Sequence, residues 1–192
     1  SWWTGDAVVA NNEDGGHQVG QYIARMGHQA IAVISGPSHI DAASDRLRGF
    51  RRALTAAGIR LPAKYILEAP FDVEGGFASA TRLLSLNPRP TAIFAGSDTI
   101  AIGALAAARA LKLRCPEDVS IVGFDDFEFS ELTQPSLTTV FQPGYHIGSL
   151  ACRLLLDRVR GAEHPPEKRV LNTELRIRNS VRSLLLPKKK SR

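Results

Sequence analysis

Cysteine is scarce in this 192-residue sequence, which contains only Cys115 and Cys152, with no CxxC pair and no histidine spacing suited to zinc. Neither a disulfide framework nor a structural metal site is therefore encoded. Apolar runs are short as well, and none approaches the roughly 20 residues that a membrane-spanning helix needs. The chain does not open with a charged segment leading into an apolar one, so no secretory signal is evident. These absences favour a cytoplasmic protein with no membrane contact.

Motifs for catalysis and nucleotide binding are also missing. The sequence holds no HExxH, no GxSxG, no Walker A loop and no GxGxxG. Response regulators place acidic pairs at strand ends together with a lysine, and no lysine follows a predicted strand in this chain. No nucleophile can be matched with a general base, and Asp98 or Asp125 alone would be a poor catalyst. The sequence predicts that the protein is not an enzyme and uses no cofactor or metal.

Charge is nearly balanced outside the C-terminus. The net charge is +5, but the last six residues, PKKKSR, contain Lys188, Lys189, Lys190 and Arg192. The rest of the chain is therefore close to neutral, which argues against a broad nucleic-acid surface. We expect residues 183–192 to form a basic, disordered and solvated tail.

The chain does contain a regular alternation of apolar strands and helices. Strands are predicted at 6–11, 30–35, 64–69, 91–96 and 119–124. Helices are predicted at 13–27, 44–58, 74–86 and 98–111, with Ser44 or Asp45 capping the second of them. The strands lack polar alternation, which is typical of a parallel sheet that is covered on both faces. The predicted fold class is therefore α/β, with a parallel sheet flanked by helices on both faces.

The pattern changes after residue 130. An extended segment is predicted at 135–140, an amphipathic helix at 145–159, and a strand or strand pair at 167–181. An earlier helix also differs from the others, because nearly every side chain between residues 100 and 113 is apolar. Two interpretations of that helix stay open: burial inside a large core, or a subunit interface.

Polar and aromatic residues gather where the predicted strands end. Ligands of open parallel sheets bind outside the carboxyl ends of the strands, and these positions hold Phe71, Ser97, Asp125 and Asp126. Arg46 adds a cation at the start of the second helix. The planar guanidinium group of Arg46 and an ionised aspartate can together bind vicinal hydroxyls, while the ring of Phe71 offers a flat apolar surface to a sugar or a base. Each of these residues, taken singly, could instead have an ordinary structural role as a solvated, capping or packing residue.

Several collinear motifs resemble the LacI/GalR transcriptional regulators over roughly residues 6–182. They include NNEDGGHQVGQYIARMGHQAIAVISGP, SDRLRGFRRALTAAGI, PTAIFAGSDTIAIGAL and CPEDVSIVGFDD. The resemblance implies a type I periplasmic-binding-protein-like core of two lobes joined by three crossovers. Residues 12–141 with 172–182 would form a nearly complete C-terminal lobe. Residues 1–11 and 142–171 would belong to a truncated N-terminal lobe, and operator DNA would be reached only through a headpiece that this chain lacks.

The resemblance also implies roles for single residues. By position, Arg46 and Asp125 match the family's polar anchors for an effector, Phe71 an aromatic wall, and Ser97 a polar contact. Asp126 is expected to tie the following turn instead. A homodimer interface would involve the apolar helix, at Ile100, Ala101, Ala104, Leu105 and Ala108.

The predicted function is that of the effector-binding and dimerisation core of a repressor, whose effector is a sugar or a related polyhydroxyl compound or nucleoside. The alternative is a free-standing solute-binding protein. Two expectations accompany it. The helix at 143–161 should expose part of its apolar face. Arg46→Ala should abolish the effector response with little change in melting temperature.

Overall fold

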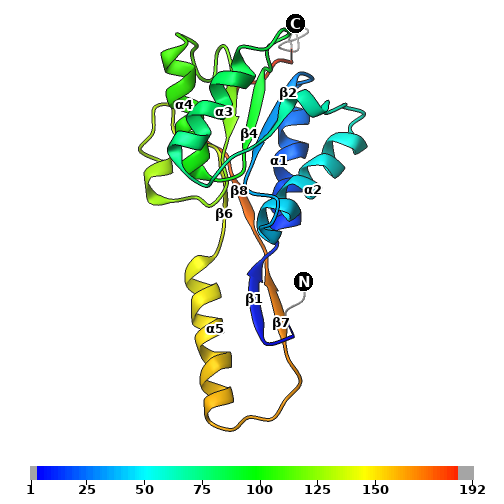
Figure 1. Ribbon diagram of the computed structural model, residues 1–192, viewed down its shortest axis with the longest axis vertical. Coiled ribbons are helices and arrows are strands. Elements are labelled where there is room, and N and C mark those ends of the chain that lie inside the picture. The colour runs from blue at the N-terminus through cyan, green and yellow to red at the C-terminus, as the bar shows by residue number, and fades with distance from the viewer. Residues whose placement is uncertain (1–3, 186–192) are drawn as a thin grey trace, which may run out of the picture.

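The computed structural model describes residues 4–185 (Figure 1). Its strands are β1 (Ala7–Ala10), β2 (Ile31–Ser35), β3 (Ile66–Glu68), β4 (Ala92–Ala95), β5 (Ser120–Val122), β6 (Thr139–Phe141), β7 (Lys168–Leu171) and β8 (Glu174–Arg176). Its α-helices are α1 (Asn12–Arg25), α2 (Asp41–Ala56), α3 (Val73–Leu84), α4 (Asp98–Ala110) and α5 (Gly144–Val159), and its 3-10 helices are η1 (Ala63–Tyr65) and η2 (Glu128–Ser130). The predicted α/β class is confirmed, and each predicted segment overlaps an element of the predicted type, although β6 overlaps the segment predicted at 135–140 only at its end.

The main sheet is parallel, with the strand order β3-β2-β4-β5. Helices α1 and α2 cover one face of it and α3 and α4 the other (Figure 1). Beyond β5, isolated parallel bridges join Val122 to Thr138 and Asp125 to Phe141, and β6 pairs antiparallel with β8. The carboxyl ends of β3, β2, β4 and β5 therefore lie in one row along a single edge of the sheet.

The core has two parts because alternate residues of each strand point to opposite faces of the sheet. On β2, Ile31 and Val33 pack with the apolar side chains of α1 and α2. The intervening Ala32 and Ile34 pack with those of α3 and α4. Burial on both faces explains why the strand sequences are uniformly apolar.

Helices α1 and α2 approach each other unusually closely. A Cβ atom added at Gly49 would lie 1.8 Å from the backbone oxygen of Glu13, and one added at Gly16 would lie 2.0 Å from that of Arg46. Only glycine leaves room for this backbone contact. The contact brings the Arg46 turn of α2 against α1 near the carboxyl ends of the strands.

The second helix differs from its prediction at its start. It begins at Asp41, one turn earlier than expected, and neither Ser44 nor Asp45 caps it. Ile40 occupies the N-cap position without a side-chain hydrogen bond, and Ser44 donates its hydroxyl to the backbone oxygen of Ser38. The predicted cap is therefore wrong.

A smaller part of the molecule lies apart from the main sheet (Figure 1). Its strands β1 and β7 pair in parallel, and α5 lies beside them. The chain passes between the two parts at residue 11, at residues 142–143 and at residues 172–173. These connections join β1 to α1, β6 to α5 and β7 to β8.

Helix α5 exposes much of its apolar face, as expected from the sequence. Leu154 is buried, but Leu155 is 64% exposed and Val159 is 76% exposed.

Between residues 4 and 185, no helix is both long and apolar enough to cross a membrane.

The apolar helix α4 is buried by its own chain. Ile100, Ala101, Ala104 and Ala108 are 0–1% exposed and belong to the core beneath α3 and the sheet. A partner subunit cannot reach these four side chains without opening that core, so the structure favours the first of the two interpretations for them. Leu105 is partly exposed, and the homodimer itself stays a prediction.

The start of the predicted tail is ordered. The backbone N–H of Leu184 donates to the oxygen of Met26 at 2.7 Å, and the side chain of Leu185 lies beside Gly27. Residues 183–185 therefore pack on the body of the protein, and the prediction was wrong for them. The remaining part of the predicted tail, 186–192, lies outside the described residues.

Candidate functional site

Arg46 is held inside the protein at the first turns of α2. It is 7% exposed, and its guanidinium lies 3.8 Å from the centre of the Phe124 ring. Its Nη1 donates to the backbone oxygen of Gly96 at 2.6 Å, and its Nε donates to Oδ1 of Asn12 at 2.8 Å. The alternative of a solvated side chain on the helix surface is excluded by this burial.

Asp125 follows β5 and faces Arg46. Its Oδ1 lies 3.2 Å from Nη1 of Arg46 and accepts a hydrogen bond from Nε2 of Gln142 at 2.6 Å. Its backbone φ is +119°, a conformation that residues with a Cβ rarely adopt, and its N–H donates to Val140 at 2.9 Å. Strained backbone that is held by its surroundings is characteristic of functional sites.

Burial governs the protonation of this ion pair. It raises the pKa of Asp125 to about 6, against the opposing positive charge of Arg46, and the nearby carboxylate of Asp98 raises this pKa further. Burial also lowers the pKa of Arg46 below its ordinary value, although both aspartates oppose this shift. At neutral pH, Asp125 is therefore mainly an ionised acceptor that titrates only slightly below the physiological range.

A pocket of about 240 Å³ brings all four predicted ligand residues together. It is lined by Ala42, Arg46, Phe71, Ser97, Thr99, Asp125 and Phe127. Phe71 leans across the end of β2, where a Cβ atom at Gly36 would lie 2.1 Å from Cζ of its ring. The pocket thus combines a cation, an anion and aromatic surfaces at the carboxyl ends of the strands.

Ser97 also has a structural task as the N-cap of α4. Its Oγ accepts from the N–H of Ile100 at 3.2 Å and lies 2.8 Å from Oγ1 of Thr99. Because Thr99 donates its own hydroxyl to the oxygen of Phe71 at 3.1 Å, Ser97 is the donor of the two. Its hydroxyl is therefore left with one lone pair to offer to a ligand.

Asp126 does not have the role predicted for it. Its Oδ1 lies 2.7 Å from Nη1 of Arg178, a residue that follows β8, and Nη2 of the same arginine lies 2.8 Å from Glu131. Asp126 thus ties the loop after β5 to the segment after β8 rather than to its own turn.

Asp98 is a buried residue whose importance the sequence does not reveal. One carboxylate oxygen accepts from Thr139 at 2.5 Å, and the other accepts from Ser130 at 2.5 Å and from the N–H of Phe127 at 3.1 Å. Burial raises the pKa of Asp98, and these hydrogen bonds oppose the shift. The carboxylate lies behind the pocket and binds segments from three elements together.

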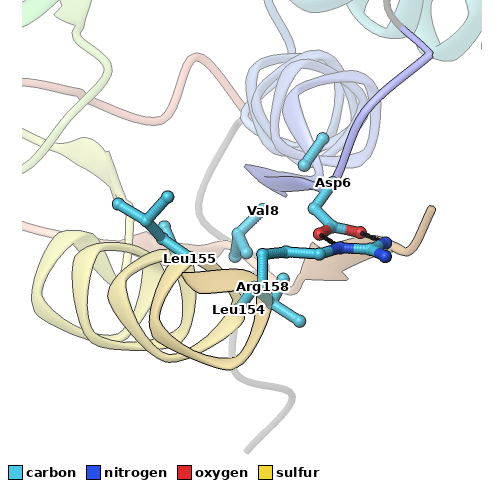
Figure 2. Close-up of a pocket in the computed structure, with 7 residues that line it drawn as sticks. Asp6, Val8, Leu154, Leu155 and Arg158 are labelled. Carbon is cyan, nitrogen blue, oxygen red and sulfur yellow. Dashed lines mark hydrogen bonds and ion pairs between the residues drawn. The ribbon is translucent and has the colours of Figure 1, made fainter. Parts of the chain in front are cut away.

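Two further pockets lie closer to the smaller part of the molecule. One, of about 520 Å³, shares Ala42 with the first and is lined by Gly5, Ala7, Val9, Asn12, His39, Ile40, Asp41, Ala42, Asp45 and Lys168. The other, of about 220 Å³, lies between β1 and α5 (Figure 2). Its walls are apolar apart from Asp6 and Arg158, whose side chains face each other in an ion pair of 2.8 Å. The polar groups of this apolar pocket therefore satisfy one another. The pocket that contains Arg46 and Asp125 offers more hydrogen-bonding groups to a polar ligand than this one does.

No group of three or more histidine, cysteine, aspartate or glutamate side chains within residues 4–185 is arranged to hold a metal ion. Cys115 is partly buried and Cys152 is exposed, and both are free thiols.

Comparison with known proteins extends these observations. Residues 20–181 match the periplasmic binding protein-like domain family. The chain is 38% identical over 176 residues to the HTH-type transcriptional repressor PurR of Escherichia coli O1:K1 / APEC, and 36% identical over 179 residues to that of Vibrio vulnificus (strain CMCP6). These matches cover 92% and 93% of the chain but 52% and 54% of the relatives. The chain thus spans about half the length of the curated relatives that it matches.

Solved structures agree. The chain is similar to a complex of the transcriptional regulator CelR with cellobiose, with a TM-score of 0.89, 38% identity, and coverage of 92% of this chain and 54% of that one. A LacI family transcriptional regulator from Mycobacterium smegmatis matches with a TM-score of 0.89 and 31% identity, covering 95% and 67%. One from Enterococcus faecium with bound ribose matches with a TM-score of 0.84 and 31% identity, covering 94% and 66%.

A parallel sheet with a polar pocket at its strand ends, together with the matched domain, defines the core of a periplasmic-binding-protein-like protein. The relatives named above with this fold are transcriptional regulators rather than enzymes. This chain belongs to the LacI/GalR family of transcriptional regulators. The resemblance seen in the sequence is thereby confirmed.

Proposed function

We propose that this chain is the effector-binding core of a DNA-binding transcriptional repressor and that its effector is a sugar or a related polyhydroxyl compound. The observation that carries the proposal is the Arg46–Asp125 pair, 3.2 Å apart in one pocket with Phe71. Such a pair can donate to and accept from adjacent hydroxyls, and each charge-assisted bond contributes about 1.5–3 kcal/mol.

An uncharged ligand suits the pocket electrostatically. One positive and one negative side chain already neutralise each other there, so a charged ligand would leave one charge unbalanced in a buried site. Cellobiose and ribose, which are bound in two of the related structures, are uncharged and rich in hydroxyls. No nucleophile with an adjacent base lines the pocket, so we expect the ligand to leave unchanged.

The ion pair also contacts the connections between the two parts of the chain. Arg46 is bonded to Asn12, next to the first connection, and Asp125 to Gln142, in the second. A ligand that engages Arg46 and Asp125 competes with these contacts. Ligand binding would thereby favour one arrangement of two lobes over another, which is a shift of population. In this scheme, residues 12–141 with 172–182 are one lobe, and residues 1–11 and 142–171 belong to the other.

Partners follow from the same proposal. In a homodimer, this movement would alter the spacing of two DNA-binding headpieces. Of the five residues of the predicted interface, Leu105 is the one that is partly exposed and could contact a partner subunit. Such a regulator acts on DNA in the cytoplasm.

A ligand screen tests the proposal. Thermal shift of the purified full-length protein against sugars, nucleosides and purines should give a rise in melting temperature with at least one sugar, confirmed by calorimetric titration. Stabilisation by none of the sugars would contradict the proposal. A free-standing solute-binding protein is the alternative, and a strictly monomeric protein in gel filtration with tight sugar affinity would favour it.

Sugar affinity should depend on pH through Asp125. Since burial raises the pKa of this carboxyl to about 6, lowering the pH from 8 to 5 protonates it and removes a charged acceptor. We expect the affinity to fall about tenfold at pH 5 if only the ionised form binds. Calorimetry at pH 5, 6.5 and 8 measures this change. The Asp125→Asn variant is the control and should bind weakly at every pH, and an equal dependence in that variant would assign the effect to another group.

The stability of the unbound protein should respond to Asp125 in the opposite direction. Between its ordinary pKa of 3.8 and its folded value of about 6, the folded state binds more protons than the unfolded state. The contribution of Asp125 to the free energy of unfolding therefore falls as the pH rises through this range. Urea unfolding of the wild type and of Asp125→Asn at pH 4.5 and 7 gives this contribution by difference. A contribution that grows with pH would contradict the raised pKa.

Gly36→Ala should weaken sugar binding at little cost in stability. The new methyl group would lie 2.1 Å from Cζ of Phe71, so the ring must swing away from the pocket. Because Phe71 is only partly buried, it can move without opening the core. We expect a several-fold loss of affinity by calorimetry, with Gly144→Ala, which has open space around it, binding like the wild type. Unchanged affinity in Gly36→Ala would mean that Phe71 does not contact the ligand.

A further inference from the structure

Phe127 is an exposed aromatic side chain at the mouth of the pocket. It is 46% exposed and lines the same pocket as Phe71. The two residues come from opposite ends of the row of strands, because Phe71 follows β3 and Phe127 follows β5, the outer strands of the order β3-β2-β4-β5. Their side chains therefore approach the pocket from two sides, with Arg46 and Ser97 contributed between them.

The backbone at Phe127 is fixed from behind by a buried carboxylate. Asp98 is fully buried and does not line the pocket, yet it accepts the N–H of Phe127 at 3.1 Å. The same carboxylate accepts the hydroxyl of Ser130 at 2.5 Å, at the other end of this short loop. It also accepts a hydrogen bond from the hydroxyl of Thr139, in β6, at 2.5 Å. An amide of the same size has a single acceptor oxygen and cannot accept all three bonds, so the loop that carries Phe127 depends on the carboxyl group of Asp98.

The neighbours of Asp98 hold the other aromatic residue. Ser97 is bonded to Thr99, and Thr99 donates to the backbone oxygen of Phe71 at 3.1 Å. The three residues at the start of α4 thus hold both aromatic segments, one from each side of the helix N-terminus.

We propose that Phe127 is a second ligand-contacting aromatic wall of this pocket and that Asp98 is the positioning residue that holds it in place. This inference rests on the proposed sugar site and makes its ligand more specific. A saccharide ring presents apolar C–H surface on its faces and hydroxyls at its edge. Its faces would contact Phe71 and Phe127, while its edge would meet Arg46 and Asp125. Ligands without a ring, such as linear polyols, would lose the aromatic contacts and bind more weakly.

The test is a double-mutant cycle on the full-length protein, with calorimetric titration of D-ribose, D-glucose and cellobiose. Phe127→Ala should weaken binding of the best of these sugars about tenfold. Leu132→Ala is the matched control, because Leu132 is 81% exposed on the same loop and does not line the pocket. This control should bind like the wild type.

Asp98→Asn keeps the shape of the side chain but removes an acceptor, and it should weaken binding to a similar extent. If Asp98 acts through Phe127, then Asp98→Asn should cause little further loss in a chain that already carries Phe127→Ala. Ser130→Ala, which removes one of the three bonds, replaces Asp98→Asn if that variant does not fold. It should show the same lack of additivity, together with a smaller loss in the single variant.

The outcomes separate this inference from the proposed function. If the wild type binds and Phe127→Ala binds equally well, the second wall is wrong while the sugar site stands. If the losses in Asp98→Asn and Phe127→Ala simply multiply, Asp98 acts independently and its positioning role is wrong. If the wild type binds none of the sugars in the ligand screen, both the proposed site and this inference are overturned.

Discussion

Replacing Arg46 by alanine is expected to lower the free energy of unfolding by about 3–5 kcal/mol and to abolish sugar binding. The guanidinium is 7% exposed and is the partner of the buried Asp125 carboxylate. Its removal also leaves the backbone oxygen of Gly96 without this donor. A buried charge without its partner is far more costly than the loss of an exposed ion pair. The burial of Arg46 thus reverses the expectation from the sequence that the melting temperature would hardly change.

Urea unfolding at pH 8 measures this loss, with Arg51→Ala as the matched control. Arg51 is exposed on the same helix, and its removal should change stability by no more than about 0.5 kcal/mol. At pH 5 the loss in Arg46→Ala should be smaller than at pH 8. The reason is that Asp125, whose pKa is already raised to about 6, can then become neutral by taking up a proton. Equal stability of Arg46→Ala and Arg51→Ala would show that the pair is not buried as described.

Gly49→Ala is expected to destabilise the protein by about 3 kcal/mol and to weaken sugar binding as well. The added methyl group would lie 1.8 Å from the backbone oxygen of Glu13, which cannot move aside as a side-chain end could. Helix α1 would have to move away from α2. The gain of about 1 kcal/mol in helix propensity is too small to offset this change. Since Arg46 lies one turn before Gly49, and Asn12 of α1 holds its Nε, the separation also disturbs the site.

Gly148→Ala provides the opposite result with the same chemical change. Gly148 lies in α5, and no atom is within 4 Å of a Cβ placed there. Alanine should therefore stabilise this helix by about 0.5–1 kcal/mol. Thermal unfolding of both variants and of the wild type measures the difference. A Gly49→Ala protein as stable as Gly148→Ala would mean that the α1–α2 contact is looser than the structure has it.

The secondary structure was predictable because its signals are local. The runs that form β2 and β4 are buried on both faces, so their short, continuous apolar sequences identify them as strands. The start of α2 gave no such signal, because Ile40 at the N-cap makes no side-chain hydrogen bond. A helix that begins without a capping side chain leaves no mark of its first turn in the sequence.

The apolar helix α4 shows why burial by the same chain could not be distinguished from burial by a partner. Composition reports only that the helix is covered, not by what. The covering element is α3, brought close by Gly76 and Gly103. A Cβ atom on Gly76 would lie 2.4 Å from the oxygen of Ile100, and one on Gly103 would lie 2.2 Å from that of Val73. Both glycines are visible in the sequence, but their pairing across two helices is not.

The candidate site was predictable in part for a geometric reason. The carboxyl ends of parallel strands meet at one edge, so Phe71, Ser97 and Asp125 had to lie near one another. The contacts of Asp126 and Asp98 could not be deduced in this way. Asp126 meets Arg178, which is distant in the chain, and Asp98 depends on how the loop after β5 turns back. Phe127 was visible as an aromatic residue beside the acidic pair, but nothing in the sequence showed that it lines the pocket.

The central claim is that Arg46 and Asp125 together hold an uncharged polyhydroxyl ligand in one pocket. Calorimetric titration of the best sugar from the screen into the wild type and Asp125→Asn at pH 8 tests this claim most directly. We predict saturable binding to the wild type and at least about tenfold weaker binding to the variant, because one charge-assisted hydrogen bond is lost. Equal affinity of the two folded proteins would contradict the claim.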